Sequence, residues 1–162
     1  MLQAVVRAGS DAQESSVCTV GLGELWLGIE TACVREVLGE RDVETVPLMP
    51  SYLAGVLPNR GVMLTVLCLR SLLGMPRYEG RSSVMIVEDG SAGGPFGLLV
   101  DRIGGIVSVT DAMLEPTPST LKEQSRQLFN GVYKLQDRLL VRIEAKQLRP
   151  ESLSELQGLV AQ

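Results

Sequence analysis

The sequence predicts a mostly β fold, organised as small β-barrels or as a sandwich. Three observations lead to this prediction. Roughly nine short apolar segments alternate with turns that contain Gly or Pro. Apolar residues make up 45% of the 162 residues, which indicates a packed globular core. Aromatic residues make up only 4%, so aliphatic side chains must fill most of that core.

The order of these segments gives the expected elements. A polar stretch, residues 1–15, is predicted to be a flexible N-terminal tail. Apolar residues recur at helical spacing after Thr31, so a short helix is expected over 32–38. An amphipathic C-terminal helix is expected over 151–162, with its leucines facing inward. The predicted strands are 17–22, 25–29, 43–46, 52–57, 62–69, 82–88, 96–100, 103–109, 128–135 and 139–143.

A hairpin at the centre of the chain carries an isolated charge. The run Pro58-Asn59-Arg60-Gly61 has the residue types of a turn and separates two apolar strands. Arg60 is the only charged residue between Tyr52 and Leu69. The predicted turn places Arg60 at the hairpin tip, where it is either simply solvated or presented to another group.

This hairpin has an echo later in the chain. When the sequence is shifted by 76 residues, Gly55-Val56 aligns with Gly131-Val132 and Leu72 aligns with Leu148. The match covers a strand, a turn, a strand and a helical segment in the same order. It therefore predicts two similar small β-modules in one chain. Each module alone would bury little apolar area, so the two are expected to share a core.

Composition argues against several classes of function. The formal net charge is −4 and no block of Lys or Arg occurs, so nucleic-acid binding is not expected. Histidine is absent, which removes the commonest general base and metal ligand. We therefore predict no catalytic residue, no metal and no cofactor. No apolar run reaches the ~20 residues that span a bilayer, so direct membrane insertion is not expected and the protein is predicted to be cytoplasmic.

A few single residues have simple structural explanations. The three cysteines lie far apart, as is typical of reduced thiols that fill a core. Cys68 lacks a histidine or an adjacent base that would lower its pKa, which argues against a thiol enzyme. Trp26, the only tryptophan, is expected to anchor the core. Asp101 and Arg102 are interpreted as charges of a turn at a strand end.

Five segments together resemble a known family. They are Val34-Arg35-Glu36-Val37-Leu38, Gly55-Val56-Leu57-Pro58-Asn59-Arg60-Gly61, Leu69-Arg70-Ser71-Leu72-Leu73-Gly74, Gly97-Leu98-Leu99-Val100-Asp101 and Gly131-Val132. In order and spacing they are similar to the CheW-like domain family, the coupling proteins of bacterial chemoreceptor arrays. Pro58, Asn59 and Cys68 depart from the family's pattern, so the chain resembles a divergent member.

The resemblance implies a fold and a function. The fold would be two SH3-like five-stranded β-barrel subdomains around a shared hydrophobic core, over residues 16–150, with short helices. The function would be that of a non-enzymatic adaptor, in the cytoplasm and associated with membrane-bound receptor arrays through its partners. Those partners would be the cytoplasmic tip of a chemoreceptor and the regulatory domain of a CheA-type histidine kinase. Two alternatives stay open: a small-ligand or peptide-binding double β-barrel outside chemotaxis, and an enzyme that uses Cys68.

The resemblance also implies receptor-binding residues. Arg60 matches the family's receptor-docking arginine, and Glu36 matches the acidic residue that pairs with it. The alternative is a solvated hairpin arginine and an unrelated glutamate. Val34, Leu57 and Ile103 are weaker candidates for an apolar groove that takes a receptor helix, and each has the alternative of being an ordinary core residue.

Overall fold

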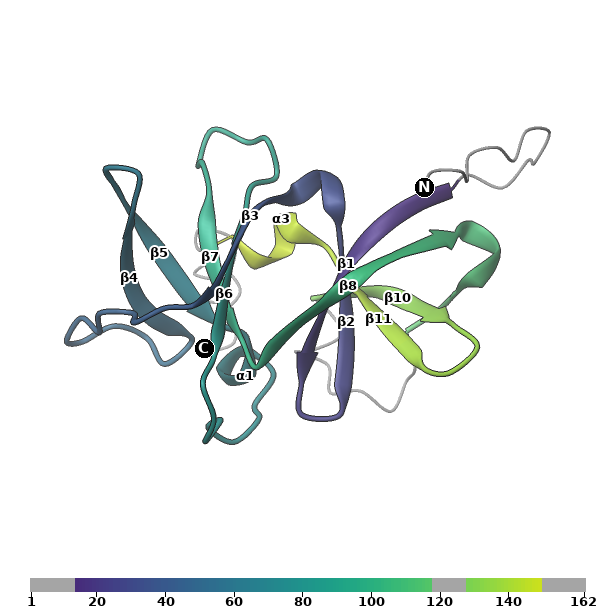
Figure 1. Cartoon of the computed structure of the whole chain (residues 1–162), viewed down its shortest axis with the longest axis horizontal. Helices are drawn as coiled ribbons and strands as arrows, with labels where there is room; N and C mark the ends of the chain where they lie inside the picture. Colours follow the sequence, from purple (N-terminus) through teal and green to yellow (C-terminus); the bar gives the residue numbers. More distant parts are fainter. Residues whose placement is uncertain (1–13, 118–127, 150–162) are drawn as a thin grey trace, which may run out of the picture.

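The computed structural model describes residues 14–117 and 128–149, and it contains two β-sheets. The first sheet has the strand order β8-β1-β2-β11-β10-β9. The second sheet has the order β3-β6-β7-β5-β4. Figure 1 shows the sheets side by side along the long axis of the molecule, with the short helices α1 and α3 between them.

The bounds of the elements follow the chain. The first sheet comprises β1 (Glu14–Leu22), β2 (Leu25–Glu30), β8 (Arg102–Thr110), β9 (Leu114–Glu115), β10 (Phe129–Lys134) and β11 (Leu139–Ile143). The second sheet comprises β3 (Val34–Glu40), β4 (Leu53–Asn59), β5 (Val62–Cys68), β6 (Ser83–Val87) and β7 (Phe96–Val100). The short helices are η2 (Thr31–Cys33), α1 (Leu69–Leu72), η3 (Asp111–Met113) and α3 (Ala145–Leu148). The chain crosses between the sheets twice, through η2 and through Asp101.

A single hydrophobic cluster joins the two sheets, which confirms the prediction of a shared core. Val20, Leu27 and Ile29 of the first sheet belong to the same cluster as Leu67 and Leu98 of the second. All five side chains are fully buried. Burial of such aliphatic side chains is the main stabilising contribution, so neither sheet would keep its core if the other were removed.

The internal echo in the sequence is confirmed in three dimensions. The parallel pair β5–β7 of the second sheet corresponds to the parallel pair β11–β2 of the first. The hairpin β4–β5 corresponds to β10–β11. The helix α1, which follows β5, corresponds to α3, which follows β11. The strand that follows each crossing forms one end of the sheet that it enters, β3 in the second sheet and β8 in the first.

Two secondary-structure predictions are wrong. Residues 32–38 do not form a helix, because only η2 is helical and Val34–Glu40 is strand β3. Pairing with β6 supplies the backbone hydrogen bonds of β3, and this tertiary contact overrides a helical apolar pattern. The predicted strand over 43–46 is reduced to one bridge, between Glu44 and Val56.

Other sequence-based expectations need adjustment or lie outside the described chain. Trp26 is only partly buried and is not a core anchor. Strand β1 begins at Glu14, so the last two residues of the predicted tail belong to this strand. The C-terminal helix over 151–162 and the first thirteen residues of the predicted tail lie outside the residues that the structure describes.

Gly55 provides a test of this architecture. Its φ is +149°, and an added Cβ would collide with the main-chain carbonyl oxygen of Glu44, which hydrogen-bonds to Val56 N–H. We predict that Gly55→Ala lowers the free energy of unfolding by about 2–4 kcal/mol, because neither the backbone conformation nor the space suits a side chain. Urea unfolding followed by circular dichroism measures this change.

Gly105→Ala is the matched control. Gly105 lies in β8, and an added Cβ there would meet nothing within 4 Å. Its substitution is expected to change the free energy of unfolding by less than about 0.5 kcal/mol. If Gly55→Ala and Gly105→Ala lowered the free energy of unfolding equally, the close contact between Gly55 and the main chain of Glu44 would be contradicted.

Candidate protein-docking site

Arg60 and Glu36 form an ion pair across the two end strands of the second sheet. Arg60 Nε donates to Glu36 Oε1 at 3.3 Å, and Arg60 Nη2 donates to Oε2 at 3.2 Å. Asn59 Nδ2 donates to Oε1 at 3.5 Å. Because Glu36 lies in β3 and Asn59 ends β4, these contacts join the two ends of the strand order. The predicted pair is therefore present, although Glu36 lies on a strand and not on a helix.

The turn geometry points Arg60 toward this contact. Arg60 has φ +52° and is followed by Gly61 with φ +81°, which makes a tight reversal between β4 and β5. The hydrogen bond from Arg60 holds the pKa of Glu36 below its ordinary value, so the carboxylate stays charged at neutral pH. The Arg60 side chain is 76% exposed, so solvent screens the pair and it contributes little to stability.

Apolar side chains are exposed close to this pair along the chain. Val37 follows Glu36 and is 50% exposed, and Val62 and Met63 follow the turn at 57% and 58%. Exposed aliphatic and charged side chains are both found at protein-docking surfaces, where an apolar centre is bordered by polar groups.

The three weaker candidates occupy two different environments. Val34 and Ile103 are half-buried and pack against the shared core, each at the start of the strand that follows a crossing between the sheets. Leu57 is only 4% exposed and belongs to a separate cluster with Val66 and Val84 inside the second sheet. Val34 and Ile103 can therefore offer apolar surface near the boundary of the sheets, whereas Leu57 is a core residue.

A second ion pair, between Arg70 and Asp101, was missed by the sequence reasoning. Arg70 Nε donates to Asp101 Oδ1 and Arg70 Nη2 donates to Oδ2, both at 2.7 Å. The N–H of Gly23, at the β1–β2 turn, also donates to Oδ2 at 2.7 Å. Arg70 Nη1 donates to the Pro76 carbonyl at 2.6 Å, and the Tyr78 ring lies 5.1 Å from the guanidinium. We call this arrangement the Arg70–Asp101 clamp.

The clamp corrects the interpretation of Asp101 as an ordinary turn charge. The Asp101 side chain is 1% exposed and that of Arg70 is 14% exposed. Burial alone would raise the pKa of Asp101, but the hydrogen bonds from Arg70 and Gly23 outweigh it and hold the pKa below its ordinary value. Residues 70 and 101 both lie within the segments that resemble the family. Neither periodicity nor spacing indicates that they meet.

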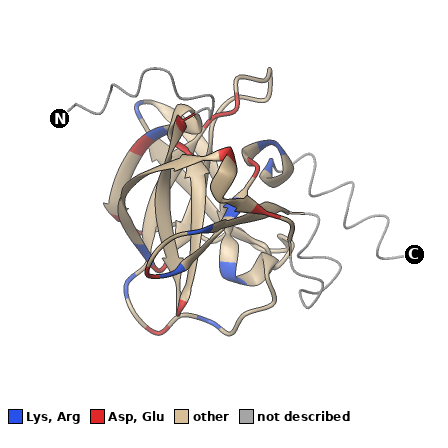
Figure 2. Cartoon of the chain, turned by 90° about the vertical axis from the view of Figure 1, so that its right-hand side faces the viewer, with Lys and Arg blue, Asp and Glu red and all other residues tan. Residues whose placement is uncertain are grey.

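The described residues offer little for the enzyme alternative. Burial raises the pKa of Cys18 and of Cys33, so both thiols stay protonated and unreactive. Within residues 14–117 and 128–149, no three His, Cys, Asp or Glu side chains are placed to hold a metal ion. No helix in this part of the chain is long and apolar enough to cross a membrane. Both signs of charge are interspersed over the face shown in Figure 2.

The β fold and the comparisons with known proteins define a class of protein, a non-enzymatic adaptor. Residues 16–151 match the family model described as "CheW-like domain". The chain belongs to the CheW-like domain family, and it is a non-enzymatic scaffold of the chemotaxis type.

Relatives and a solved structure agree with this assignment. The chain is 30% identical to a "Probable chemotaxis protein CheW" of Rhizobium etli over 134 residues, which cover 83% of this chain and 86% of the relative. It is 27% identical to a "Chemotaxis protein CheW" of Rhizobium meliloti, with the same coverage of both chains. Its fold is similar to the crystal structure of the scaffolding protein TtCheW from Thermoanaerobacter tengcongensis. That match has a TM-score of 0.71 at 23% identity and covers 81% of this chain and 89% of the other.

The clamp leads to a prediction about stability. We expect Asp101→Asn to lower the free energy of unfolding by about 3 kcal/mol, because it leaves the largely buried Arg70 without its counter-charge. Arg81→Ala, which removes one partner of the exposed ion pair with Glu40, is the control and should change the midpoint of unfolding little. Equal small effects of both substitutions would show that the clamp does not hold the fold together.

The same carboxylate predicts a pH dependence. An unfolded aspartate has a pKa of about 3.9, and the pKa of Asp101 in the folded protein is lower. The stability that the clamp provides is therefore fully present above the unfolded value and is lost as the pH falls through the folded value. The difference in unfolding free energy between the wild type and Asp101→Asn should be constant from about pH 5 to pH 7. It should shrink below about pH 4 when measured by urea unfolding at each pH.

Proposed function

We propose that this chain couples the cytoplasmic tips of chemoreceptors to the regulatory domain of a CheA-type histidine kinase. It would act in the cytoplasm, as an adaptor held at membrane receptor arrays through these partners. The observation that carries the proposal is the exposed Arg60–Glu36 pair at a hairpin tip, in a chain of the CheW-like domain family. The relatives are named as chemotaxis proteins, which supports the pathway.

The receptor tip is proposed to dock at Arg60 and along the boundary of the two sheets. Arg60 keeps most of its surface exposed while its guanidinium is oriented by Glu36. A fixed guanidinium loses little side-chain freedom when a partner carboxylate or carbonyl binds it. Val34 and Ile103 would supply apolar contacts to a receptor helix, as an amphipathic helix needs in a groove. Leu57 would act only indirectly, by supporting the second sheet.

A binding measurement tests the assignment of Arg60. Isothermal titration calorimetry with a receptor-tip fragment and, separately, with a kinase regulatory domain gives the two affinities. We expect Arg60→Ala to weaken receptor binding about tenfold, because it removes a charged contact at a docking surface, and to leave kinase binding within about twofold. Arg81→Ala changes an exposed arginine of the same sheet that pairs with Glu40, so it should leave both affinities unchanged.

A double-mutant cycle separates the pair from its two members. If Glu36 acts by orienting Arg60, the loss on Glu36→Ala, Arg60→Ala should be smaller than the sum of the two single losses. Additive losses would mean that the two residues contribute independently. Failure of the wild type to bind any receptor or kinase fragment would overturn the proposed function.

A further inference from the structure

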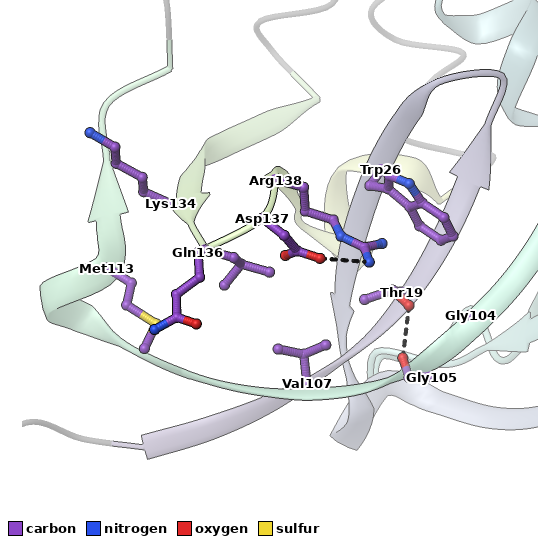
Figure 3. A pocket seen from close by; sticks show the side chains of 11 residues that line it. Thr19, Trp26, Gly104, Gly105, Val107, Met113, Lys134, Gln136, Asp137 and Arg138 are labelled. Atoms are coloured by element: carbon purple, nitrogen blue, oxygen red, sulfur yellow. Dashed lines mark hydrogen bonds and ion pairs between the residues drawn. The ribbon is translucent and has the colours of Figure 1, made fainter.

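A pocket of about 640 Å³ opens on the first sheet, far along the chain from the Arg60 turn. It lies between strand β8 and the turn of the β10–β11 hairpin, as Figure 3 shows. Its walls include Trp26, Gly105, Val107, Met113, Gln136 and Arg138. The volume is in the range of pockets that bind small molecules or single peptide side chains with their neighbours.

This pocket is the counterpart, in the first sheet, of the Arg60–Glu36 site. Val37 of β3 pairs with Met85, and Ile106 of β8 pairs with Cys18 at the matching position of the first sheet. The residue before Val37 is Glu36, and the residue before Ile106 is glycine. Both strand pairs also have an irregularity at this point of the register. Gly105 therefore takes the place of Glu36.

The facing hairpin turns correspond as well. The shift of 76 residues that relates α1 to α3 also relates Arg60 to Gln136 and Asn59 to Leu135. Gln136 and Leu135 both line the pocket. At the equivalent position of the second sheet, Glu36 of β3 is bound by Arg60 of the hairpin turn. In the first sheet the acid is absent, and a Cβ at Gly105 would meet nothing within 4 Å, so the place is open.

The walls of the pocket combine positive charge with apolar surface. Arg138 lines the pocket and its guanidinium lies 4.7 Å from the Trp26 ring centre, and Arg102, which is outside the lining, lies 4.6 Å from the same ring centre. Asp137, the one acid among the described lining residues, pairs with Arg138 at 3.2 Å, and Lys134 is a second basic residue of the lining. This local excess of positive charge lies in a chain of net charge −4. It suits a carboxylate next to an apolar side chain.

The edge of β8 favours a peptide as the occupant. β8 is an end strand of its sheet, so an extended segment can lie along its outer edge and hydrogen-bond to its main chain. Ile106 of this strand is 69% exposed. We propose that the pocket binds a short segment of a partner protein with an acidic side chain beside an apolar one. The partner's carboxylate takes the place that Glu36 fills from within the chain in the second sheet.

Trp26 makes this proposal directly testable, because it is the only tryptophan and lies in the pocket. Heptapeptides displayed on phage are selected against the full chain, and an enriched peptide is synthesised and titrated while tryptophan fluorescence is recorded. We expect enriched peptides to carry Asp or Glu next to an apolar residue and to change the fluorescence. Replacing the acid by its amide should weaken binding about tenfold, because a charge-assisted hydrogen bond is lost.

Two variants show whether the site is the pocket itself. Gly105→Glu places a carboxylate of the chain itself in the pocket, where it competes with the acid of the peptide. It should weaken peptide binding at least about tenfold. Ser108→Glu places the same charge on an exposed position of β8 outside the pocket lining, and should have less than about a twofold effect. Lys134→Gln should weaken binding severalfold without a change in the unfolding midpoint, since Lys134 is exposed.

Three outcomes would overturn the proposal. These are a selection without any enriched peptide, enriched peptides whose binding does not need an acid, and equal effects of Gly105→Glu and Ser108→Glu. None of them touches the Arg60 site, so the proposal can fail while the adaptor function stands, and the reverse also holds.

Discussion

The Arg70–Asp101 clamp is the contact on which the arrangement of the two sheets depends. Asp101 is the residue at which the chain passes from β7 to β8, and its carboxylate binds both α1 and the β1–β2 turn. It therefore fixes the crossing point, the helix after β5 and a turn of the other sheet at once. The two hydrogen bonds of this almost fully buried pair are lost if either residue moves far, so the pair fixes how the sheets are oriented relative to each other. The apolar core holds the sheets together but fixes their orientation less strictly.

The clamp is present at only one of the two crossings. In the other crossing, through η2, Ala32 stands at the position that matches Asp101, and Lys146 of α3 matches Arg70. Ala32 has no carboxylate, so Lys146 cannot form the equivalent pair with it. The η2 crossing has a different ion pair close to it: Arg149, which follows α3, lies 3.8 Å from the buried carboxylate of Asp89, the residue after Glu88, whose N–H donates to the carbonyl of Cys33. Two modules with the same strand order have become unequal in the contacts that hold them.

The same divergence distinguishes the two hairpin turns. In the second sheet Arg60 and Glu36 close the space between the end strands with an internal pair. In the first sheet Gln136 and Gly105 leave that space open, and Trp26 and Arg138 form part of its wall. An adaptor needs several surfaces for different partners, and a duplicated module provides two related surfaces that can change separately. The exposed Arg60–Glu36 pair contributes little to the stability of the fold, so a partner can bind Arg60 without destabilising the protein.

The sequence alone determined the mostly β class, the two related modules, most strand positions and the turn that presents Arg60, because these follow from local periodicity and turn chemistry. The Arg60–Glu36 pair came from the family resemblance. Only the tertiary structure decided that residues 34–40 form a strand, since pairing with β6 outweighs a helical pattern. It also decided that Asp101 is buried against Arg70 and that Trp26 lines a pocket. Such contacts join distant residues, and no local pattern in a single sequence specifies which distant residues will meet.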